Sequence, residues 1–296
     1  MAISDTLSSI ITNLNNAYSQ IGTMGGTIPL SKNMENLPSA IGTIPTGGND
    51  RLIEYAMGDI DNLDYSEITR IEKGAFAMYD PLVVVSLPNC SEIGDLAFSY
   101  CHNLSVVNLP SCVSIGYDAF CYCDNLLSIE LPNVEWIGSR AFSDCSGLAY
   151  VSIPNCISTN DHAFYNCGNL QVVYCPNMTA IESYTFYSCN SLTDISPLTV
   201  SYVGVNAFRS CTHLPSVILS VPEGGTLNIS QSAFANCNAL TTMTIYGSTM
   251  ATLSGGGIGA PLTQTGTIYV PASLVSTYKA NTGWRNYSNR IQSISE

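Results

Sequence analysis

One stretch of this 296-residue chain is a clear example of a pattern that recurs along most of its length: Ile115-Gly116-Tyr117-Asp118-Ala119-Phe120-Cys121-Tyr122-Cys123-Asp124-Asn125-Leu126. The residue before the Phe of each copy is Ala, except at Thr185, and the third residue after it is Cys, except at Tyr79. A pattern that returns at a fixed period predicts a fold of equivalent stacked units. Here the period is 22 residues, with one last interval of 26, and the equivalents of Phe120 are Phe76, Phe98, Phe142, Phe164, Phe186, Phe208 and Phe234.

Each unit continues with apolar residues six, nine and eleven positions after its Phe, which are Leu104, Val107 and Leu109 in the unit of Phe98. Apolar and polar residues alternate here, and this predicts a short strand with one buried face. A unit of this length cannot enclose its own core, so neighbouring units must share one. The stacked strands then form a parallel ladder with about 4.8 Å between neighbours. The Ala-Phe segment is too short for a full helix and predicts one turn of 3₁₀ or α-helix on the opposite side.

This pattern resembles the BspA-like class of leucine-rich repeats, found in bacterial surface proteins and in some phage proteins, whose signature is I-G-x-x-A-F-x-x-C-x-x-L. The resemblance runs from about residue 60 to residue 271, and two units depart from it, at Thr159 and at Ser196-Pro197, where local irregularity is expected. It implies an α/β repeat solenoid, a right-handed horseshoe of 22-residue coils with the β ladder on its concave side and short 3₁₀ or helical turns on its convex side. It also implies a protein that binds proteins or glycans and is not an enzyme.

Three segments are expected along the chain: 1–48, 49–271 and 272–296. The first is a helical attachment or oligomerisation segment with a linker, because Ile3, Leu7, Ile10 and Leu14 share one helical face. Such an apolar stripe requires a partner, so residues 1–45 predict an oligomer or a larger assembly. A cap for the first coil is the alternative interpretation of this helix. The middle segment is the solenoid, and the last is a C-terminal cap.

Charge and hydropathy exclude several classes of partner. The 9 Lys and Arg residues against 22 Asp and Glu residues give a net charge of −13 at pH 7. Such a chain repels the phosphate backbone, so no nucleic-acid partner is expected. The apolar runs fall far short of the roughly 20 residues needed to span a bilayer, so no membrane insertion is expected. The first residues lack the basic start and apolar core of a secretory signal, so no signal peptide is expected.

Cysteine and histidine residues offer no reactive or metal-binding pattern. Seven of the 12 Cys share one repeat position, and Cys90, Cys112 and Cys156 share another that Val134 and Met178 also occupy. Exchange with Val and Met indicates a small buried apolar slot, so the thiols are expected to be reduced. The three His occupy unrelated repeat positions, and no hydrolase or nucleotide-binding motif occurs. No catalytic residue, metal site or cofactor is therefore predicted.

The outward residues of the predicted strands are the candidate ligand-binding positions. They carry few charges, and Tyr side chains combine rigid contact area with a hydrogen-bonding end. We expect a protein or glycan ligand on the concave face, although a plain solvated face is the alternative. A second row of Tyr residues, at positions 79, 100, 122, 165 and 187, is expected to cover the edge of the core on the convex side. The candidate ligand-binding residues are Asn108, Glu130, Tyr150, Tyr174 and Asp194.

These features together predict a non-enzymatic recognition or structural module. The first hypothesis is a phage virion component, in the tail or in host recognition, which binds a protein or a glycan on a host surface. The alternative is a bacterial cell-surface adhesin of the BspA-like type. The expected location is accordingly the virion or the bacterial extracellular surface.

Overall fold

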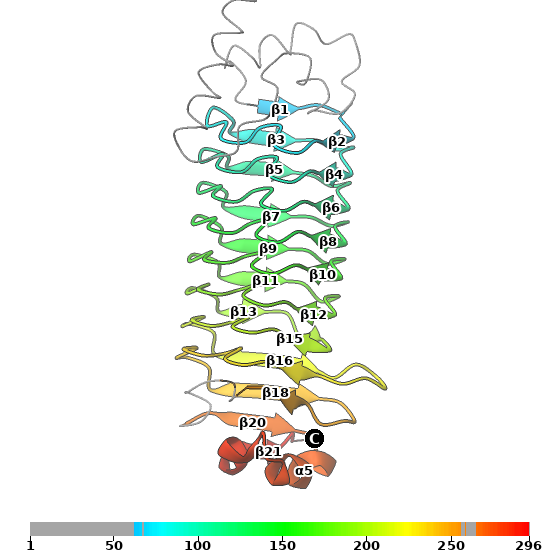
Figure 1. Cartoon of the computed structure of the whole chain (residues 1–296), viewed down its shortest axis with the longest axis vertical. Helices are drawn as coiled ribbons and strands as arrows, with labels where there is room; N and C mark the ends of the chain where they lie inside the picture. The colour runs from blue at the N-terminus through cyan, green and yellow to red at the C-terminus, as the bar shows by residue number, and fades with distance from the viewer. Residues whose placement is uncertain (1–61, 67, 256–257, 259–264, 296) are drawn as a thin grey trace, which may run out of the picture.

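The computed structural model describes residues 62–66, 68–255, 258 and 265–295, so the expected segment 1–48 lies outside the described residues. The described chain winds into a column of stacked coils, with short helices at its C-terminal end (Figure 1). The predicted repeat solenoid is therefore confirmed. The column is nearly straight, so the ladder face that was expected to be concave is close to flat (Figure 1).

The predicted strands form a parallel ladder, here called the first ladder. Neighbouring strands pair in register, so that Val85 lies beside Val107, and Ile129 beside Val151. The ladder is interrupted between β5 and β7, and again after β13, where Ser196 and Pro197 replace the usual residues. The irregularity expected at Ser196-Pro197 is thus confirmed. Its strands are β1 (Asn62–Asp64), β3 (Val84–Ser86), β5 (Val106–Asn108), β7 (Ser128–Glu130), β9 (Tyr150–Ser152), β11 (Val172–Tyr174), β13 (Asp194–Ile195), β14 (Leu198–Thr199), β16 (Ser216–Ser220), β18 (Thr242–Tyr246) and β20 (Thr267–Val270).

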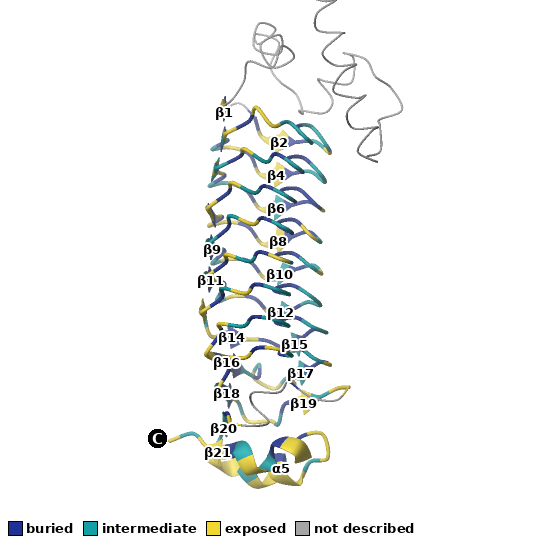
Figure 2. Cartoon of the chain, turned by 90° about the vertical axis from the view of Figure 1, so that its left-hand side faces the viewer, coloured by how far each residue is buried: buried dark blue, intermediate teal, exposed yellow. Residues whose placement is uncertain are grey.

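A second parallel ladder, which the sequence did not predict, runs beside the first (Figure 2). Each strand has two residues, and in every strand but β19 an outward residue is followed by a buried one, such as Ile115 or Ile137. Regular strand pairing is interrupted between β10 and β12, although the Thr179 N–H still bonds to the Ile157 carbonyl at 3.0 Å. The buried Oγ1 of Thr159, beside this interruption, has no hydrogen-bond partner among the described residues. The irregularity expected at Thr159 is therefore confirmed. The strands are β2 (Arg70–Ile71), β4 (Glu92–Ile93), β6 (Ser114–Ile115), β8 (Trp136–Ile137), β10 (Ser158–Thr159), β12 (Ala180–Ile181), β15 (Tyr202–Val203), β17 (Asn228–Ile229) and β19 (Thr252–Leu253).

The third side of each coil contains the Ala-Phe segment, which is a run of hydrogen-bonded turns. In the coil of Phe98, the N–H groups of Ala97 and Ser99 bond to carbonyls three residues back, as in a 3₁₀ turn. The N–H groups of Leu96, Phe98 and Tyr100 bond to the next coil instead, each at 2.7 Å. Because every second N–H group donates to the next coil and not within its own, the turns do not continue into a helix. Every backbone donor of this segment still finds an acceptor, as a buried backbone requires.

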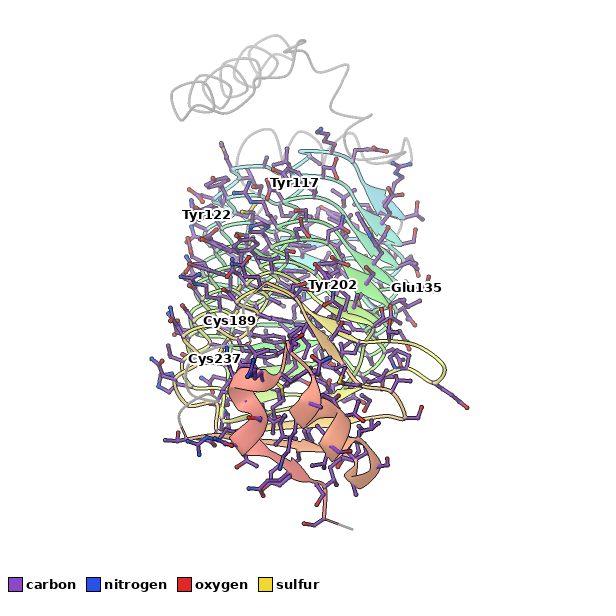
Figure 3. All side chains as sticks on the ribbon, turned by 60° about the horizontal axis from the view of Figure 1, so that its bottom comes forward. Tyr117, Tyr122, Glu135, Cys189, Tyr202 and Cys237 are labelled. Carbon is purple, nitrogen blue, oxygen red and sulfur yellow. The ribbon has the colours of Figure 1, made fainter. Side chains whose placement is uncertain are left out.

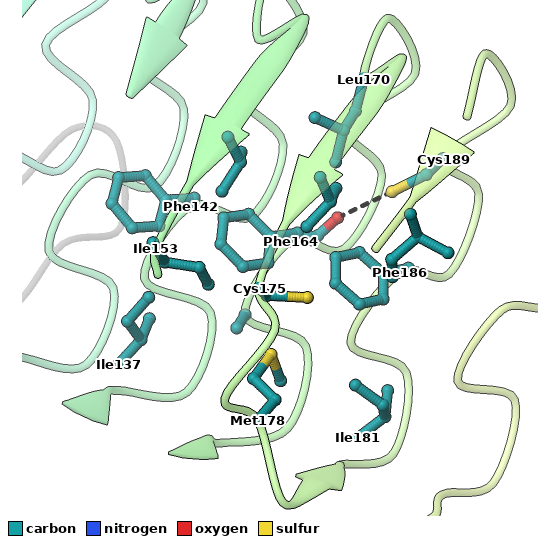
Figure 4. Packing of buried hydrophobic residues seen from close by; sticks show 14 of the residues in the cluster. Ile137, Phe142, Ile153, Phe164, Leu170, Cys175, Met178, Ile181, Phe186 and Cys189 are labelled. Carbon is teal, nitrogen blue, oxygen red and sulfur yellow. Dashed lines mark hydrogen bonds between the residues drawn. The ribbon is translucent and has the colours of Figure 1, made fainter. Parts of the chain in front are cut away.

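The core consists of columns of identical side chains that run through the stack. The rings of Phe120 and Phe142 lie 5.2 Å apart and within 2° of parallel, and Phe142 and Phe164 lie 5.4 Å apart. Cys189 lies beside this column and donates a hydrogen bond from Sγ to the carbonyl of Phe164 at 3.2 Å (Figure 4). Each column buries the same apolar surface once per coil, so the core extends through the whole stack.

Residues after β20 cover the last coil with η2 (Ala272–Leu274), α5 (Val275–Ala280), η3 (Arg285–Arg290) and β21 (Ile291–Ser293). Trp284 is fully buried and donates from Nε1 to the carbonyl of Ala251 at 2.7 Å. The hydroxyl of Tyr278 accepts a bond from the Ala251 N–H at 2.8 Å, and that of Tyr287 accepts one from the Ile258 N–H at 2.8 Å. These bonds tie the helices to backbone groups of the final coils.

Candidate binding surface

The five candidate ligand-binding residues lie on one face of the first ladder. Each comes from a different strand of the run β5, β7, β9, β11 and β13, and each occupies a position that points away from the core. Four of them are exposed, and Tyr150 is half-buried. The exposed residues are Asn108, Glu130, Tyr174 and Asp194.

Strand register arranges these side chains in two neighbouring columns. Tyr150 lies between Ser128 and Val172 in one column, and Asp194 follows Val172. In the other column Glu130 pairs with Ser152, and Ser152 pairs with Tyr174. The small Ser neighbours leave the sides of both tyrosine rings accessible along the ladder. The face therefore presents two phenol groups and two carboxylates on a rigid backbone.

Two exposed apolar side chains adjoin the candidate residues, and of these only Leu127 was not expected to point outward. Leu127 is 63% exposed and immediately precedes β7, and Val106 on β5 is 49% exposed. The position of Leu127 holds Ser105, Gln171 or Thr193 in some coils but Val83 or Ala149 in others, so the sequence pattern gave no signal of its exposure. Exposed apolar side chains beside Tyr residues are typical of interaction surfaces. Leu127 and Val106 add apolar contact area to the predicted site.

The cysteine residues occupy the predicted buried slots, and all 12 are free thiols in the described part of the chain. Burial raises the pKa of Cys112, Cys121 and Cys156 from the ordinary value of 9.0 to about 12. A thiol must ionise to act as a nucleophile or a metal ligand. These thiols are therefore inert packing groups. The described residues contain no cluster of three His, Cys, Asp or Glu side chains placed to share a metal ion.

One histidine contacts a carboxylate in an arrangement that differs from that of a serine hydrolase. His102 Nδ1 lies 2.7 Å from Asp124 Oδ2, and Ser146 donates from Oγ to Asp124 Oδ1 at 2.9 Å. In a hydrolase triad the imidazole lies between the hydroxyl and the carboxylate, so that it can take the hydroxyl proton. Here the carboxylate lies in the middle, and the Ser146 hydroxyl already donates to it. This group is therefore a surface hydrogen-bond bridge between neighbouring coils.

The convex-side tyrosines form close pairs on the third side of the coils. Tyr100 stacks on Tyr122 at 4.6 Å, and Tyr165 stacks on Tyr187 at 5.0 Å, with interplanar angles of 12° and 10°. All four are half-buried, so they cover the core edge, as expected, and still reach the surface.

Within the described residues, no helix is long and apolar enough to cross a bilayer.

Several solved leucine-rich repeat structures are similar to parts of this chain. A leucine-rich repeat protein of T. pallidum is 30% identical, with a TM-score of 0.47, over 50% of this chain and 72% of its own length. One from Bacteroides ovatus is 20% identical, with a TM-score of 0.33, over 77% of this chain and 88% of its own. A leucine-rich cell surface protein of Faecalibacterium prausnitzii is 18% identical, with a TM-score of 0.34, over 77% of each chain. No curated protein matches the chain.

The sequence pattern of the BspA type leucine-rich repeat region matches residues 55–171 and 113–241, in six copies. Repeats of this kind typically serve as non-enzymatic binding modules, and proteins that carry them are typically found at the cell surface. The match extends over more than half of the 296 residues. The chain therefore belongs to the BspA-type leucine-rich repeat family.

Proposed function

We propose that this protein is a non-enzymatic recognition module, which binds a protein or a glycan on a host surface through the outward face of the first ladder. The observation that carries the proposal is the arrangement of Tyr150 and Tyr174 on adjacent strands, with only small or aliphatic neighbours beside them. Phenol groups supply contact area and hydrogen bonds with little loss of side-chain entropy. Glu130 and Asp194 add acceptors for hydroxyl or amide donors of a ligand.

Backbone rigidity supports the same proposal. Strands β7, β9, β11 and β13 form one continuous hydrogen-bonded sheet, and the residue in the middle of each full strand, such as Val151 or Val173, is buried. Outward side chains on such a scaffold are held in place before a ligand arrives. A preorganised surface loses less entropy on binding than a flexible loop does.

The test is a binding screen of residues 1–296 against glycans and host-surface proteins, followed by paired variants. Tyr150→Ser and Tyr174→Ser introduce the residues that Ser128 and Ser152 already provide at the equivalent repeat positions. We expect the double variant to keep its fold and to bind the identified ligand at least tenfold more weakly. Thr244→Ser, on the same ladder but nearer its C-terminal end, is the matched control and should bind normally. Unchanged binding by the double variant would place the ligand elsewhere.

We further propose that the module belongs to a phage particle, as a tail or host-recognition component, with residues 1–45 as its attachment point. The 12 buried free thiols support this proposal, because disulfides rarely form where virion proteins fold, in the reducing cytosol. The second candidate is a bacterial cell-surface adhesin of the BspA-like type, which the bacterial leucine-rich repeat proteins among the similar structures favour.

An antibody against residues 62–295 distinguishes the two locations. Gold labelling of purified phage particles, and none on cells that carry no phage, is the result expected for the virion protein. Labelling of the cell surface in a phage-free culture would instead identify the adhesin.

A further inference from the structure

Six aromatic side chains gather on the third side of the column, where they form a surface that we call the tyrosine patch. Its members come from the coils of Phe98, Phe120, Phe164 and Phe186, and all are half-buried. Besides the two tyrosine pairs, His162 stacks on Tyr184 at 4.6 Å, and the rings of Tyr184 and Tyr187 lie 5.7 Å apart. The patch lies away from the first ladder, in the turns that contain the Ala-Phe segments. Its members are Tyr100, Tyr122, His162, Tyr165, Tyr184 and Tyr187.

The backbone beneath the patch does not favour bulky residues. Tyr100, Tyr122 and Tyr184 each have a φ of 60°, in the left-handed region that Gly, Asn and Asp tolerate best. The same repeat positions hold Asn166 and Asn206 in other coils, with φ values of 58° and 55°. Those coils adopt the same turn without an aromatic ring. Folding of the coil therefore does not require a tyrosine at these positions.

The coil of Phe142 separates the two groups of rings and supplies charge between them. It carries Ser143 and Asp144 where the neighbouring coils carry aromatic residues, so no aromatic side chain at these positions covers the side of Tyr122 that faces this coil. Asp144 accepts hydrogen bonds from Ser143 Oγ at 2.6 Å and from Asn166 Nδ2 at 2.8 Å. A carboxylate is thus held in a defined position between two aromatic groups.

Negative charge dominates this part of the column. From Gly74 to Phe208 the chain contains a single Lys or Arg residue, Arg140, against eleven Asp and Glu residues. Arg140 is exposed, and its Nη1 lies 3.5 Å from the hydroxyl of Tyr117, at the margin of the patch. Asp118 is 9% exposed, and its Oδ1 has no hydrogen-bond partner among the described residues. Tyr122 lies at the left edge of the column in Figure 3, and Glu135 lies at the right edge.

We propose that the tyrosine patch is a second binding surface, which takes a protein segment rich in Lys or Arg. Tyr rings attract cationic side chains through their π faces, and they are enriched among the residues that dominate protein interfaces. Asp144 and Asp118 provide the complementary charge beside the rings. This inference does not rest on the function proposed for the first ladder, because the two surfaces share no residue.

The test uses the full chain, fluorescein-labelled deca-arginine as the probe, and fluorescence anisotropy at 150 mM salt. The triple variant Tyr100→Asn, Tyr122→Asn and Tyr184→Asn keeps the net charge and introduces residues that occur at the same repeat positions. We expect it to bind the probe at least tenfold more weakly, with a melting temperature equal to or above that of the parent. The control, Tyr202→Ala with Tyr246→Ser, removes two aromatic residues elsewhere on the column and should change binding less than twofold.

Each remaining outcome argues against the proposal. Equal binding by the parent and the triple variant, or equal losses in the triple variant and the control, would mean that the probe responds only to net charge. A melting temperature that falls by roughly 5 °C or more in the triple variant would mean that the rings stabilise the fold. The ladder variant Tyr150→Ser with Tyr174→Ser should bind the probe normally, so failure of either proposal is recognised separately.

Discussion

The thiol of Cys145 donates a hydrogen bond of 3.0 Å to the carbonyl of Phe120 in the preceding coil. The same bond recurs in every coil that carries this Cys, from Cys101 on Phe76 at 3.1 Å to Cys237 on Phe208 at 2.9 Å. The other Cys column is different, because Cys112 bonds to Ser114, two residues away in its own coil. The thiols of the first column therefore donate to a neighbouring coil, whereas those of the second column donate within their own coil. This explains why that position remains Cys in seven units, whereas the other exchanges with Val and Met.

Replacing Cys145 with Val should accordingly destabilise the column more than the same change at Cys112. Cys145→Val removes the bond to Phe120 and adds volume in a packed column, and we expect a loss of about 1–3 kcal/mol. Cys112→Val should change stability by less than about 0.5 kcal/mol, because Val134 already fills the equivalent slot. Urea denaturation followed by circular dichroism measures both. Equal shifts of the two midpoints would show that the thiol acts only as a space filler.

Stability should decrease at alkaline pH. Burial raises the pKa of the Cys90 thiol from 9.0 to about 11, and that of Cys112 to about 12. Above pH 9 the unfolded chain loses thiol protons that the folded chain retains, so the free energy of unfolding falls as pH rises toward these values. Each such thiol contributes up to about 1.4 kcal/mol per pH unit.

The measurement is the urea midpoint at pH 7, 9 and 10. Cys112→Val with Cys156→Val removes two of the titrating groups, and it should make the dependence on pH shallower. A midpoint that is constant from pH 7 to pH 10 would contradict the burial of the thiols.

The left-handed positions of the third side should reject β-branched residues. In the described part of the chain, all 15 non-glycine residues with positive φ lie two residues before or after a repeat Phe, and none of them is Val, Ile or Thr. Ser210, with a φ of 64°, is such a position. Ser210→Val should destabilise the protein by about 1–2 kcal/mol, because the branched side chain clashes with its own backbone there. Ser210→Asn is the control and should be nearly neutral in the same denaturation experiment.

The phenylalanine column should be far more sensitive than the ladder face. Phe142 is fully buried between the rings of Phe120 and Phe164. Phe142→Ala should lower the free energy of unfolding by about 3–5 kcal/mol, as for other buried aromatic residues. Tyr150→Ala should change it little, since that side chain lies on the outward face of β9. Calorimetry of both variants tests whether Phe142 lies in the core and Tyr150 on the outward face. Equal losses of stability in the two variants would refute this placement.

Deletion of residues 1–48 should leave a folded solenoid. The apolar stripe of Ile3, Leu7, Ile10 and Leu14 predicts a partner for this segment and not a part of the column core. We expect the truncated protein to retain its β-rich circular dichroism spectrum and its cooperative melt, and to change its oligomeric state in light scattering. Loss of the folded spectrum would identify the segment as the cap of the first coil.

The sequence by itself determined the length of the coil, the first ladder, the Phe column and the burial of the thiols. These features depend on which apolar residues recur at which phase, and a 22-residue period displays that phase directly. It also placed Asn108, Glu130, Tyr150, Tyr174 and Asp194 on one face, because side chains alternate along a strand. The exposure of Leu127 was not predicted, since hydrophobicity alone suggests burial.

Only the tertiary structure decided the second ladder, the left-handed turns and the place of His162 and Tyr184 in the tyrosine patch. Two-residue strands such as Ser114–Ile115 are too short to show an alternation, and they exist because their N–H groups reach the neighbouring coil. Contact with the neighbouring coil also shapes the turns, where successive N–H groups donate alternately to the next coil and within their own coil. The Phe98 N–H donates to Ala119, whereas the Ala97 N–H donates to Gly94. Hydrogen-bond partners that are 21 residues apart, such as Phe98 and Ala119, leave no recognisable pattern in the local sequence. The stacked rings of Tyr100 and Tyr122 then follow from this backbone, which brings equivalent residues of successive coils within 4.6 Å.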